Sequence, residues 1–331
     1  MADLRAGLIG LGMMGRHHAR VLGSLPGVDL VAVADPSGDA HGVAGGRPVL
    51  SSVEELVEAG IDYCMVAVPT MYHERIGLTL AAAGVHALIE KPLATDVDAC
   101  ARLVTAFEER GLVGAVGHIE RYNPALQEAR RRLAAGDLGS VFQIATRRQG
   151  PFPARIADVG VVKDLGTHDI DLTAWVAQQP FAAVAARTAH RSGREHEDLV
   201  SITGVLADGT VTSHLVNWLS PMKERVTIIT GERGAFVADT LTADLTFYAN
   251  GTESIAWSDI ANFRGVSEGD VIRYAFPKPE PLRTEHEAFR DAVLGQDSDI
   301  VTLRQGMATV VVAEAVIRSA TEGVSVDVRT S

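Results

Sequence analysis

Short apolar runs alternate with segments of helical character over the first third of the chain. The apolar runs predict strands at 4–9, 30–34, 63–68, 86–90 and 113–117. The segments between them predict helices at about 13–25, 72–83 and 96–110, and a short helix that opens at Ser52 with Glu55 three residues later. This alternation is typical of a parallel sheet with right-handed crossovers, so the sequence predicts an α/β protein.

The pattern changes near residue 141 to longer alternating strands with few helices between them. Strands are predicted at 141–148, 184–190, 199–206, 210–218, 225–230, 235–239 and 244–248, with a hairpin turn at 207–209. Helices are predicted at 284–294 and 302–321, and 249–281 reads as extended loop. We therefore expect two domains: residues 1–119 with the parallel sheet, and residues 120–331 with an α+β fold on a mixed or antiparallel sheet. At least one face of the second sheet must be buried against helices or another subunit.

A glycine motif connects the first predicted strand to the first predicted helix. Gly10, Gly12 and Gly15 have the spacing Gly-x-Gly-x-x-Gly, with Met13 and Met14 between them. A dinucleotide pyrophosphate needs a tight turn, a backbone without a Cβ in its way and a helix N-terminus, and these glycines supply all three. The sequence therefore predicts a Rossmann-type nucleotide site.

Asp35 ends the second predicted strand, 20 residues after Gly15. A carboxylate there accepts hydrogen bonds from the adenosine ribose and repels a 2′-phosphate, which favours NAD over NADP. The alternative is a turn residue before Pro36.

Polar and small residues follow the other predicted strands. They are Pro69 and Thr70, Glu90 and Lys91, and Gly117 and His118. Ligands of parallel sheets bind beyond the carboxyl ends of the strands, so we expect these residues to line one crevice with the glycine turn. His73 begins a helix near this crevice, where it either contacts the nicotinamide ribose or caps the helix.

Lys91, Asp164 and His168 are the candidate catalytic residues. Oxidation of an alcohol by a nicotinamide requires a base for the hydroxyl proton and a donor for the developing alkoxide. The i, i+4, i+7 spacing of Asp164, His168 and Asp171 places them on one helix face, where a carboxylate orients an imidazole. The alternatives are a surface lysine and capping acids beside a partly buried histidine; a metal site lacks a third ligand, so we predict none.

Composition narrows the class of protein. The chain has 331 residues, 47% of them hydrophobic and 22% charged, and a formal charge of -12. This charge argues against nucleic acid or a membrane surface as partner. Cys64 and Cys100 fall in apolar runs and are read as reduced core residues, and neither a signal peptide nor a membrane-spanning run is predicted, so we expect a cytoplasmic protein.

Over essentially its whole length the chain resembles the family of glucose-fructose oxidoreductase, inositol dehydrogenase and rhizopine catabolism proteins, Gfo/Idh/MocA. The resemblance rests on Gly10-x-Gly12-x-x-Gly15 with His18, Asp35, the triplet Glu90-Lys91-Pro92, and Asp164-x-x-x-His168. It implies that Lys91, Asp164 and His168 are catalytic. It also implies that the second domain is an open-faced mixed sheet for substrate and for assembly as a homodimer or homotetramer.

A narrower likeness covers residues 117–125 and 147–160, which resemble the branch of UDP-N-acetylglucosamine 3-dehydrogenases. It implies substrate contacts for His118, Arg121, Tyr122, Asn123, Arg148 and Arg155 besides Lys91, Asp164 and His168. Arg147, Arg148, Arg155 and Lys163 concentrate positive charge suited to a diphosphate. Alternatively, Arg147 and Arg148 simply point to opposite faces of one strand.

The sequence thus predicts an NAD-dependent dehydrogenase of a secondary sugar hydroxyl, namely C3 of a UDP-linked N-acetylhexosamine. Two alternatives stay open: a dehydrogenase or ketoreductase of a free sugar, an inositol or an antibiotic sugar, and a non-catalytic dinucleotide-sensing regulator. The enzymatic hypothesis expects the Lys91 amine and the His168 imidazole to act on the same carbon and to handle the alcohol proton.

Overall fold

The computed structural model describes residues 3–152, 159–251 and 268–328. These residues form two compact units. Unit 1 runs up to residue 119 and includes 279–311, and unit 2 contains 120–278 and the residues from 312 onward. The chain therefore leaves unit 1 after residue 119, returns to it at residue 279 and leaves it again after residue 311.

Unit 1 is built on a six-stranded sheet in the order β3-β2-β1-β4-β5-β6, and all its neighbouring strands are parallel. This confirms the predicted Rossmann-type sheet. Its strands are β1 (Leu4–Ile9), β2 (Val28–Ala34), β3 (Val49–Leu50), β4 (Tyr63–Val66), β5 (His86–Glu90) and β6 (Gly114–Gly117). Its helices are α1 (Met13–Leu22), α2 (Val53–Glu58), α3 (His73–Ala82), α4 (Val97–Glu108) and α8 (Pro281–Val293), with a short turn of 3-10 helix, η1 (Thr70–Tyr72).

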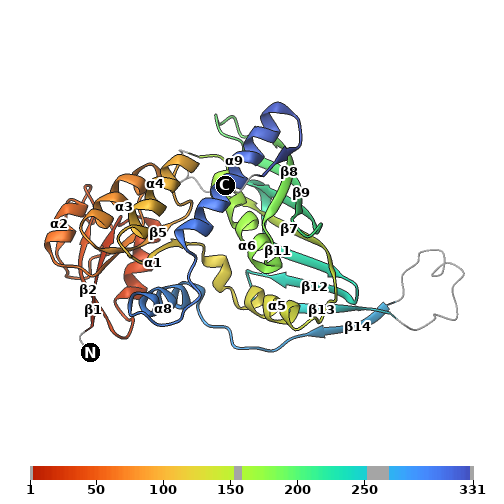
Figure 1. Ribbon diagram of the computed structural model, residues 1–331, viewed down its shortest axis with the longest axis horizontal. Coiled ribbons are helices and arrows are strands. Elements are labelled where there is room, and N and C mark those ends of the chain that lie inside the picture. Colours follow the sequence, from red (N-terminus) through yellow and green to blue (C-terminus); the bar gives the residue numbers. More distant parts are fainter. Residues whose placement is uncertain (1–2, 153–158, 252–267, 329–331) are drawn as a thin grey trace, which may run out of the picture. The chain divides into compact units, whose positions relative to one another are not determined.

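Local signals explain where these helices begin. The Ser52 hydroxyl accepts the Glu55 N–H at 3.2 Å at the start of α2, and the Asp96 carboxylate accepts the Ala99 N–H at 2.8 Å at the start of α4. Helix α1 packs against α8, and α3 packs against α2 and α4 (Figure 1). Helices therefore lie on both faces of the sheet, as the crossover connections require.

Helix α8 completes the core of unit 1. Phe289 on α8 is 1% exposed and meets Tyr63 of β4 edge-to-face, with ring centroids 5.4 Å apart. Both rings belong to the cluster that contains Leu8, Leu30 and Met65 of the sheet. Part of the core of unit 1 is thus supplied by α8, which lies far along the chain from the strands it packs on.

Unit 2 is built on a nine-stranded mixed sheet in the order β14-β13-β12-β11-β7-β10-β9-β8-β15. Only β7 and β10 are parallel neighbours among its described strands. The strands are β7 (Val141–Pro151), β8 (Phe181–Ala189), β9 (Leu199–Leu206), β10 (Val211–Asn217), β11 (Leu219–Gly231), β12 (Gly234–Asp239), β13 (Asp244–Asn250), β14 (Glu268–Arg273) and β15 (Val326–Asp327). The helices are η2 (Ile119–Tyr122), α5 (Pro124–Ala134), η3 (Val162–Gly166) and α6 (Thr167–Ala177), while α9 (Leu303–Glu322) divides between the units.

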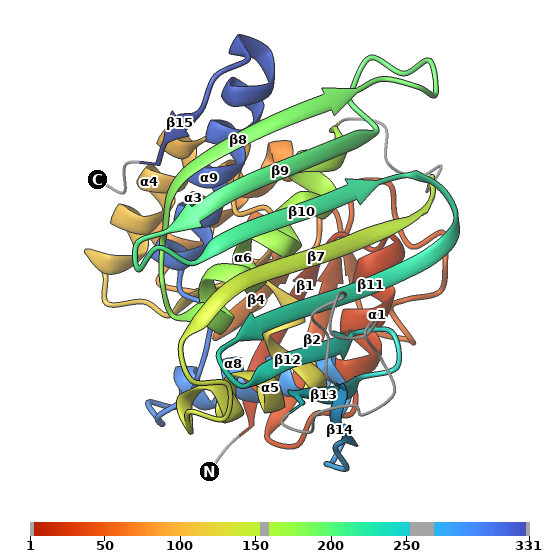
Figure 2. The ribbon, with the colours of Figure 1, turned by 90° about the vertical axis from the view of Figure 1, so that its right-hand side faces the viewer.

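Helices α5 and α6 cover one face of this sheet. Leu126, Leu172 and Trp175 from the helices pack on Ile144 and Phe236 from the strands. In Figure 2 both helices lie behind the strands, and no described helix covers the face toward the viewer. The open-faced mixed sheet predicted for the second half is therefore confirmed.

The opposite face of the sheet carries apolar side chains. Alternation along β10, β11 and β13 places Val211, Ile228 and Tyr248 there, and they are 50%, 36% and 47% exposed. The prediction of an extended loop over 249–281 is wrong for Glu268–Arg273, which form the short edge strand β14 with the sequence Glu-Gly-Asp-Val-Ile-Arg. Residues 252–267 of that segment lie outside the described residues.

Replacement of Phe289 tests the role of α8. Phe289→Ala removes a fully buried ring from the core and is expected to lower the free energy of unfolding by about 3–5 kcal/mol. Leu294→Ala, just past the end of the same helix at a 40% exposed side chain, is the control and should cost less than about 1 kcal/mol. Denaturant unfolding of both variants measures this; equal effects would show that α8 is not part of the core.

Candidate functional site

The glycine turn of unit 1 leaves a cradle at the start of α1. Gly10 has a φ of +95°, and a Cβ there would lie 2.5 Å from the carbonyl oxygen of Ala67. A Cβ on Gly15 would lie 1.9 Å from the carbonyl oxygen of Gly10, whereas one on Gly12 would meet nothing within 4 Å. Gly12 precedes α1 and no side chain caps this end of the helix, so the helix N-terminus fits a dinucleotide pyrophosphate.

Asp35 lies at the carboxyl end of β2 beside this turn. Its carboxylate accepts the Leu11 N–H at 2.9 Å and the Ser37 N–H at 2.8 Å. These bonds hold the glycine turn against the loop after β2, and the carboxylate keeps lone pairs for ribose hydroxyls. Within the motif, Met13 is 48% exposed and Met14 is half-buried.

The carboxyl ends of β4, β5 and β6 carry the other predicted residues of unit 1. Pro69 and Thr70 follow β4, and the half-buried Lys91 directly follows β5. His118 follows β6 and is 1% exposed. Since these strands run parallel to β1 in the same sheet, their ends lie along the same edge as the glycine turn.

His73 is buried under this edge. Its Nδ1 lies 3.0 Å from the Pro92 carbonyl oxygen, and its Nε2 lies 2.9 Å from the Val68 carbonyl oxygen. Burial lowers the pKa of this imidazole. The ring thus joins the loop after β4 to the loop after β5, and this placement favours bracing of the Lys91 loop over the ribose contact predicted for it.

Glu90 is also turned inward. Its Oε1 lies 2.9 Å from Nε2 of His18, and its Oε2 accepts the Lys91 N–H at 3.0 Å. Burial by itself raises the pKa of Glu90, but the hydrogen bond and charge of His18, with Lys91, lower it by more. The carboxylate therefore stays charged inside unit 1, directly behind the predicted catalytic lysine.

In unit 2, Asp164 and His168 lie where a π-helical turn, Val162–Gly166, runs into α6. Asp164 is 7% exposed and His168 is half-buried. Asp164 lies within the π turn, whereas His168 and Asp171 lie within α6, so the predicted i, i+4, i+7 set spans two kinds of helix. Single π turns within helices occur frequently at functional sites.

Two buried ion-pair groups hold α6 in place. Arg121 on η2 donates to both carboxylate oxygens of Asp171, at 2.8 and 2.6 Å. Arg148 on β7 donates to Asp169 at 2.7 Å and to Glu120 at 2.8 Å. These carboxylates already compensate both guanidinium groups, which argues against the diphosphate contact predicted for Arg148.

The remaining predicted substrate contacts have varied surroundings. Tyr122 is 5% exposed. Asn123 caps α5 by accepting the Ala125 N–H at 3.0 Å, and it donates to the Thr240 carbonyl at 3.0 Å. Arg155 lies outside the described residues.

Sequence reasoning missed Glu120, Asp169, Glu285 and His286 as buried polar groups. All but Glu120, whose side chain is 15% exposed, are at most 1% exposed. A signal was present, because Asp169, Glu285 and His286 interrupt otherwise apolar helix faces, and a buried charge needs a partner. The partners themselves come from distant segments.

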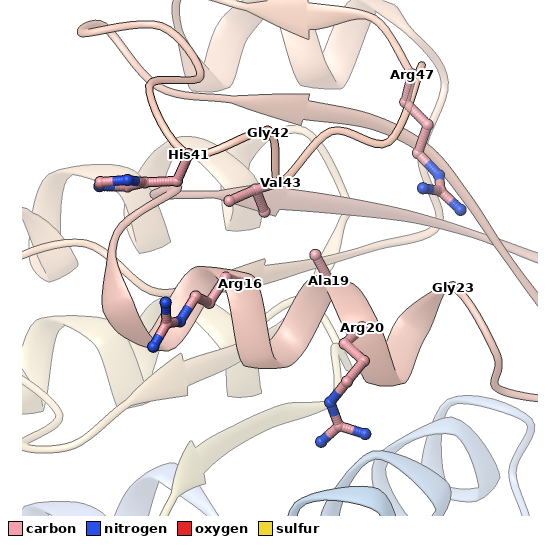
Figure 3. A pocket seen from close by; sticks show the side chains of 8 residues that line it. All are labelled: Arg16, Ala19, Arg20, Gly23, His41, Gly42, Val43 and Arg47. Carbon is pink, nitrogen blue, oxygen red and sulfur yellow. The ribbon is translucent and has the colours of Figure 1, made fainter.

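A hollow of about 370 Å³ lies beside α1 and the loop after β2. Arg16, Arg20, His41 and Arg47 line it, but their charged ends point apart (Figure 3). Arg20 is paired with Glu280, and Arg47 donates to the Leu30 carbonyl. The hollow therefore lacks converging donors for an anion.

The described residues show neither a metal-binding cluster nor a membrane-spanning helix. They contain no group of three or more His, Cys, Asp or Glu arranged to hold a metal ion. Among their helices, none has both the length and the hydropathy that a membrane crossing requires.

Both halves of the chain match models of one protein family. Residues 4–118 match the model described as an oxidoreductase family with an NAD-binding Rossmann fold. Residues 126–237 match the C-terminal domain of the GFO/IDH/MocA family. The predicted family and its NAD-binding fold are confirmed by these two matches.

Named relatives include dehydrogenases of an inositol and of a nucleotide sugar. An inositol 2-dehydrogenase of Saccharopolyspora erythraea is 34% identical over 223 residues, which are 62% of this chain and 65% of that protein. A UDP-N-acetylglucosamine 3-dehydrogenase of Acidithiobacillus ferrooxidans is 35% identical over 176 residues, 52% of this chain and 54% of that protein. The matched segments thus span less than two thirds of either relative.

A solved structure extends the likeness to the full length. The UDP-N-acetylglucosamine 3-dehydrogenase GnnA from Acidithiobacillus ferrooxidans superposes with a TM-score of 0.84 at 26% identity. The superposition covers 97% of this chain and 99% of that one.

The Arg121–Asp171 pair yields a stability prediction. Arg121→Met leaves the Asp171 carboxylate buried without its main donor and is expected to lower the free energy of unfolding by about 3–5 kcal/mol. Arg121→Met combined with Asp171→Leu removes both charges and should recover most of this loss. Denaturant unfolding measures both; a single variant that costs less than about 1 kcal/mol would contradict the pairing.

Proposed function

The chain belongs to the Gfo/Idh/MocA oxidoreductase family, and we propose that it is an NAD-dependent dehydrogenase of a secondary hydroxyl on a sugar or polyol. The observation that carries this proposal is the arrangement of unit 1. A cradle for a dinucleotide at Gly10–Gly15 and a lysine directly after β5 lie along one edge of a single parallel sheet. That edge is where such sheets bind their ligands.

The proposed roles follow from the chemistry of each side chain. NAD, when bound, supplies the acceptor of the hydride. Lys91 hydrogen-bonds the substrate oxygen and stabilises the negative charge that develops on it. His168 takes up the hydroxyl proton, and Asp164 orients the imidazole from the preceding π turn. Gly10, Gly12, Gly15 and Asp35 hold the cofactor.

For the substrate, the proposal favours C3 of a UDP-linked N-acetylhexosamine. Its support is the 3-dehydrogenase with 35% identity over half of the chain and the full-length likeness to GnnA. A free inositol is the second candidate, because an inositol 2-dehydrogenase has a similar identity of 34%. Because Glu120 and Asp169 already pair with Arg148, we expect other residues to contact the diphosphate.

The proposal also includes the assembly of the chain into an oligomer. The uncovered apolar face of the unit 2 sheet suits a second copy of the chain, so we place the contact of a homodimer or homotetramer there.

A regulator that only senses the dinucleotide needs neither Lys91 nor the Asp164 and His168 pair, and the presence of these residues favours the enzyme.

Removal of the lysine amine tests the catalytic assignment. Lys91→Ala is expected to lower kcat/KM by about 1,000-fold, because proton handling and charge stabilisation at the substrate oxygen are both lost. The Kd of NADH, followed by fluorescence, should change less than about threefold. Lys223→Ala, at an exposed lysine on β11, is the control and should keep full turnover. Full turnover in Lys91→Ala would overturn the role given to Lys91.

A substrate panel tests the specificity. The protein is incubated with NAD and, separately, with UDP-N-acetylglucosamine, N-acetylglucosamine and inositol, and the absorbance of the reduced cofactor is followed. We expect kcat/KM for the nucleotide sugar to exceed that for the free sugar by about 100-fold, the value of about 3 kcal/mol of added binding. A preference for inositol would instead support the second candidate, and reduction with none of them would contradict the proposal.

A further inference from the structure

A row of buried polar side chains runs through unit 1 and ends at Lys91. Nε2 of His286 on α8 lies 2.8 Å from Nδ1 of His18 on α1. Nε2 of His18 lies 2.9 Å from Oε1 of Glu90, and Oε2 of Glu90 accepts the Lys91 N–H at 3.0 Å. His286, His18 and Glu90, the buried row, are 1%, 0% and 9% exposed.

The hydrogen atoms of the buried row have few possible positions. The carboxylate of Glu90 only accepts, so Nε2 of His18 must donate to it. A single hydrogen then lies between the two imidazoles, and it belongs either to a neutral His286 that donates or to a charged His18 that donates. In both arrangements Glu90 receives a hydrogen bond from each side.

The charged groups around the row favour the ionised state of Glu90. Burial, with the nearby charge of Glu90, raises the pKa of Glu285 on α8 well above its ordinary value, so Glu285 is neutral. Burial, with the charge of His18, lowers the pKa of His286 well below its ordinary value, so His286 is neutral. On α3, burial lowers the pKa of His73, and the charge of Glu90 opposes this shift without cancelling it. The negative charge of this group of acids therefore stays on the carboxylate next to Lys91.

We propose that His18 and His286 are positioning residues for the reaction proposed above. They hold Glu90 as a carboxylate, and Glu90, through its bond to the Lys91 N–H, fixes the main chain from which the Lys91 side chain projects. This inference rests on the proposed function for the part that concerns turnover. The hydrogen bonds themselves belong to unit 1 alone and are independent of substrate.

The neighbouring strand leaves room for this arrangement. Glu90 pairs in register with Gly117 of β6. A Cβ at Gly117 would lie 3.3 Å from Oε2 of Glu90, closer than an ordinary contact. The glycine thus lets the carboxylate turn toward the Lys91 N–H.

Packing alone does not explain the row. Two imidazoles and a carboxyl group inside a core cost desolvation energy, and apolar residues of similar volume often give equal or greater stability. The negative charge of Glu90, next to Lys91, instead affects the position of the candidate catalytic lysine directly. A misplacement of a catalytic group by about 1 Å costs on the order of 100-fold in rate.

The first test is the pH profile of turnover. His18→Ala removes the hydrogen bond and the charge that lower the pKa of Glu90, and burial then raises it. Glu90 becomes protonated as the pH falls through this raised value, so the pH profile of kcat should gain an acidic limb of about 100-fold beyond any limb of the unaltered protein. Adding Glu90→Gln to His18→Ala should remove this limb, because the amide does not titrate, while kcat stays low.

The second test needs no substrate. Amide hydrogen exchange of the full chain, read at the Lys91 N–H, should speed up by about tenfold in His18→Ala and less in His286→Gln, which keeps an amide donor near His18. His17→Ala, on the same turn of α1 but outside the row, is the matched control and should change neither exchange nor kcat. Thermal unfolding of each variant confirms that it folds.

The two tests separate the two claims. Faster exchange at Lys91 without turnover of any sugar would retain the buried row and overturn the proposed function. Normal turnover in His18→Ala, with an unchanged pH profile and unchanged exchange, would overturn the positioning role and leave the proposed function standing. The same losses in His17→Ala would also overturn the positioning role, because they would mark a general disturbance of α1.

Discussion

The buried carboxylate of Glu90 is the constraint around which unit 1 is arranged. A charge at the end of β5 is stable only if donors surround it, and they come from His18 on α1 and from the Lys91 main chain. His18 in turn needs His286, which lies on a helix that reaches unit 1 only after the chain has built most of unit 2. The return of α8 therefore serves both the core, through Phe289, and the candidate site.

In unit 2, buried carboxylates are stabilised by ion pairs with arginine side chains. Arg121 binds Asp171 and Arg148 binds Asp169, so η2 and β7 are both tied to the first part of α6. Such pairs add little net stability over apolar residues, but they accept only one arrangement of the elements that carry them. That arrangement fixes the π turn with Asp164 and the start of α6 with His168, the two residues that the proposed mechanism requires to act together.

Much of the fold could be predicted because its signals are local. The strands of unit 1 are continuous apolar runs since both faces of the sheet are buried, and the caps Ser52 and Asp96 mark where helices begin. The glycine turn was predictable because Gly10 and Gly15 meet backbone that no Cβ can approach. The partners of Glu90 and Arg148 were not predictable, because alternation assigns a side chain to a face but does not say which distant segment lies opposite it. The edge strand β14 was missed because its only apolar residues are the adjacent pair Val271 and Ile272, which is too short to predict a strand.

The ionisation of the two buried acids of unit 1 tests this account most directly. Carbon-13 labelling of the glutamate carboxyl groups in the full chain, with signals assigned by Glu90→Gln and Glu285→Gln, reports the state of each by NMR as the pH is varied. The account predicts that near neutral pH Glu90 is ionised and Glu285 is protonated, since His18 and Lys91 stabilise only the first. A protonated Glu90 beside an ionised Glu285, or two carboxyl groups that titrate as exposed glutamates do, would contradict it.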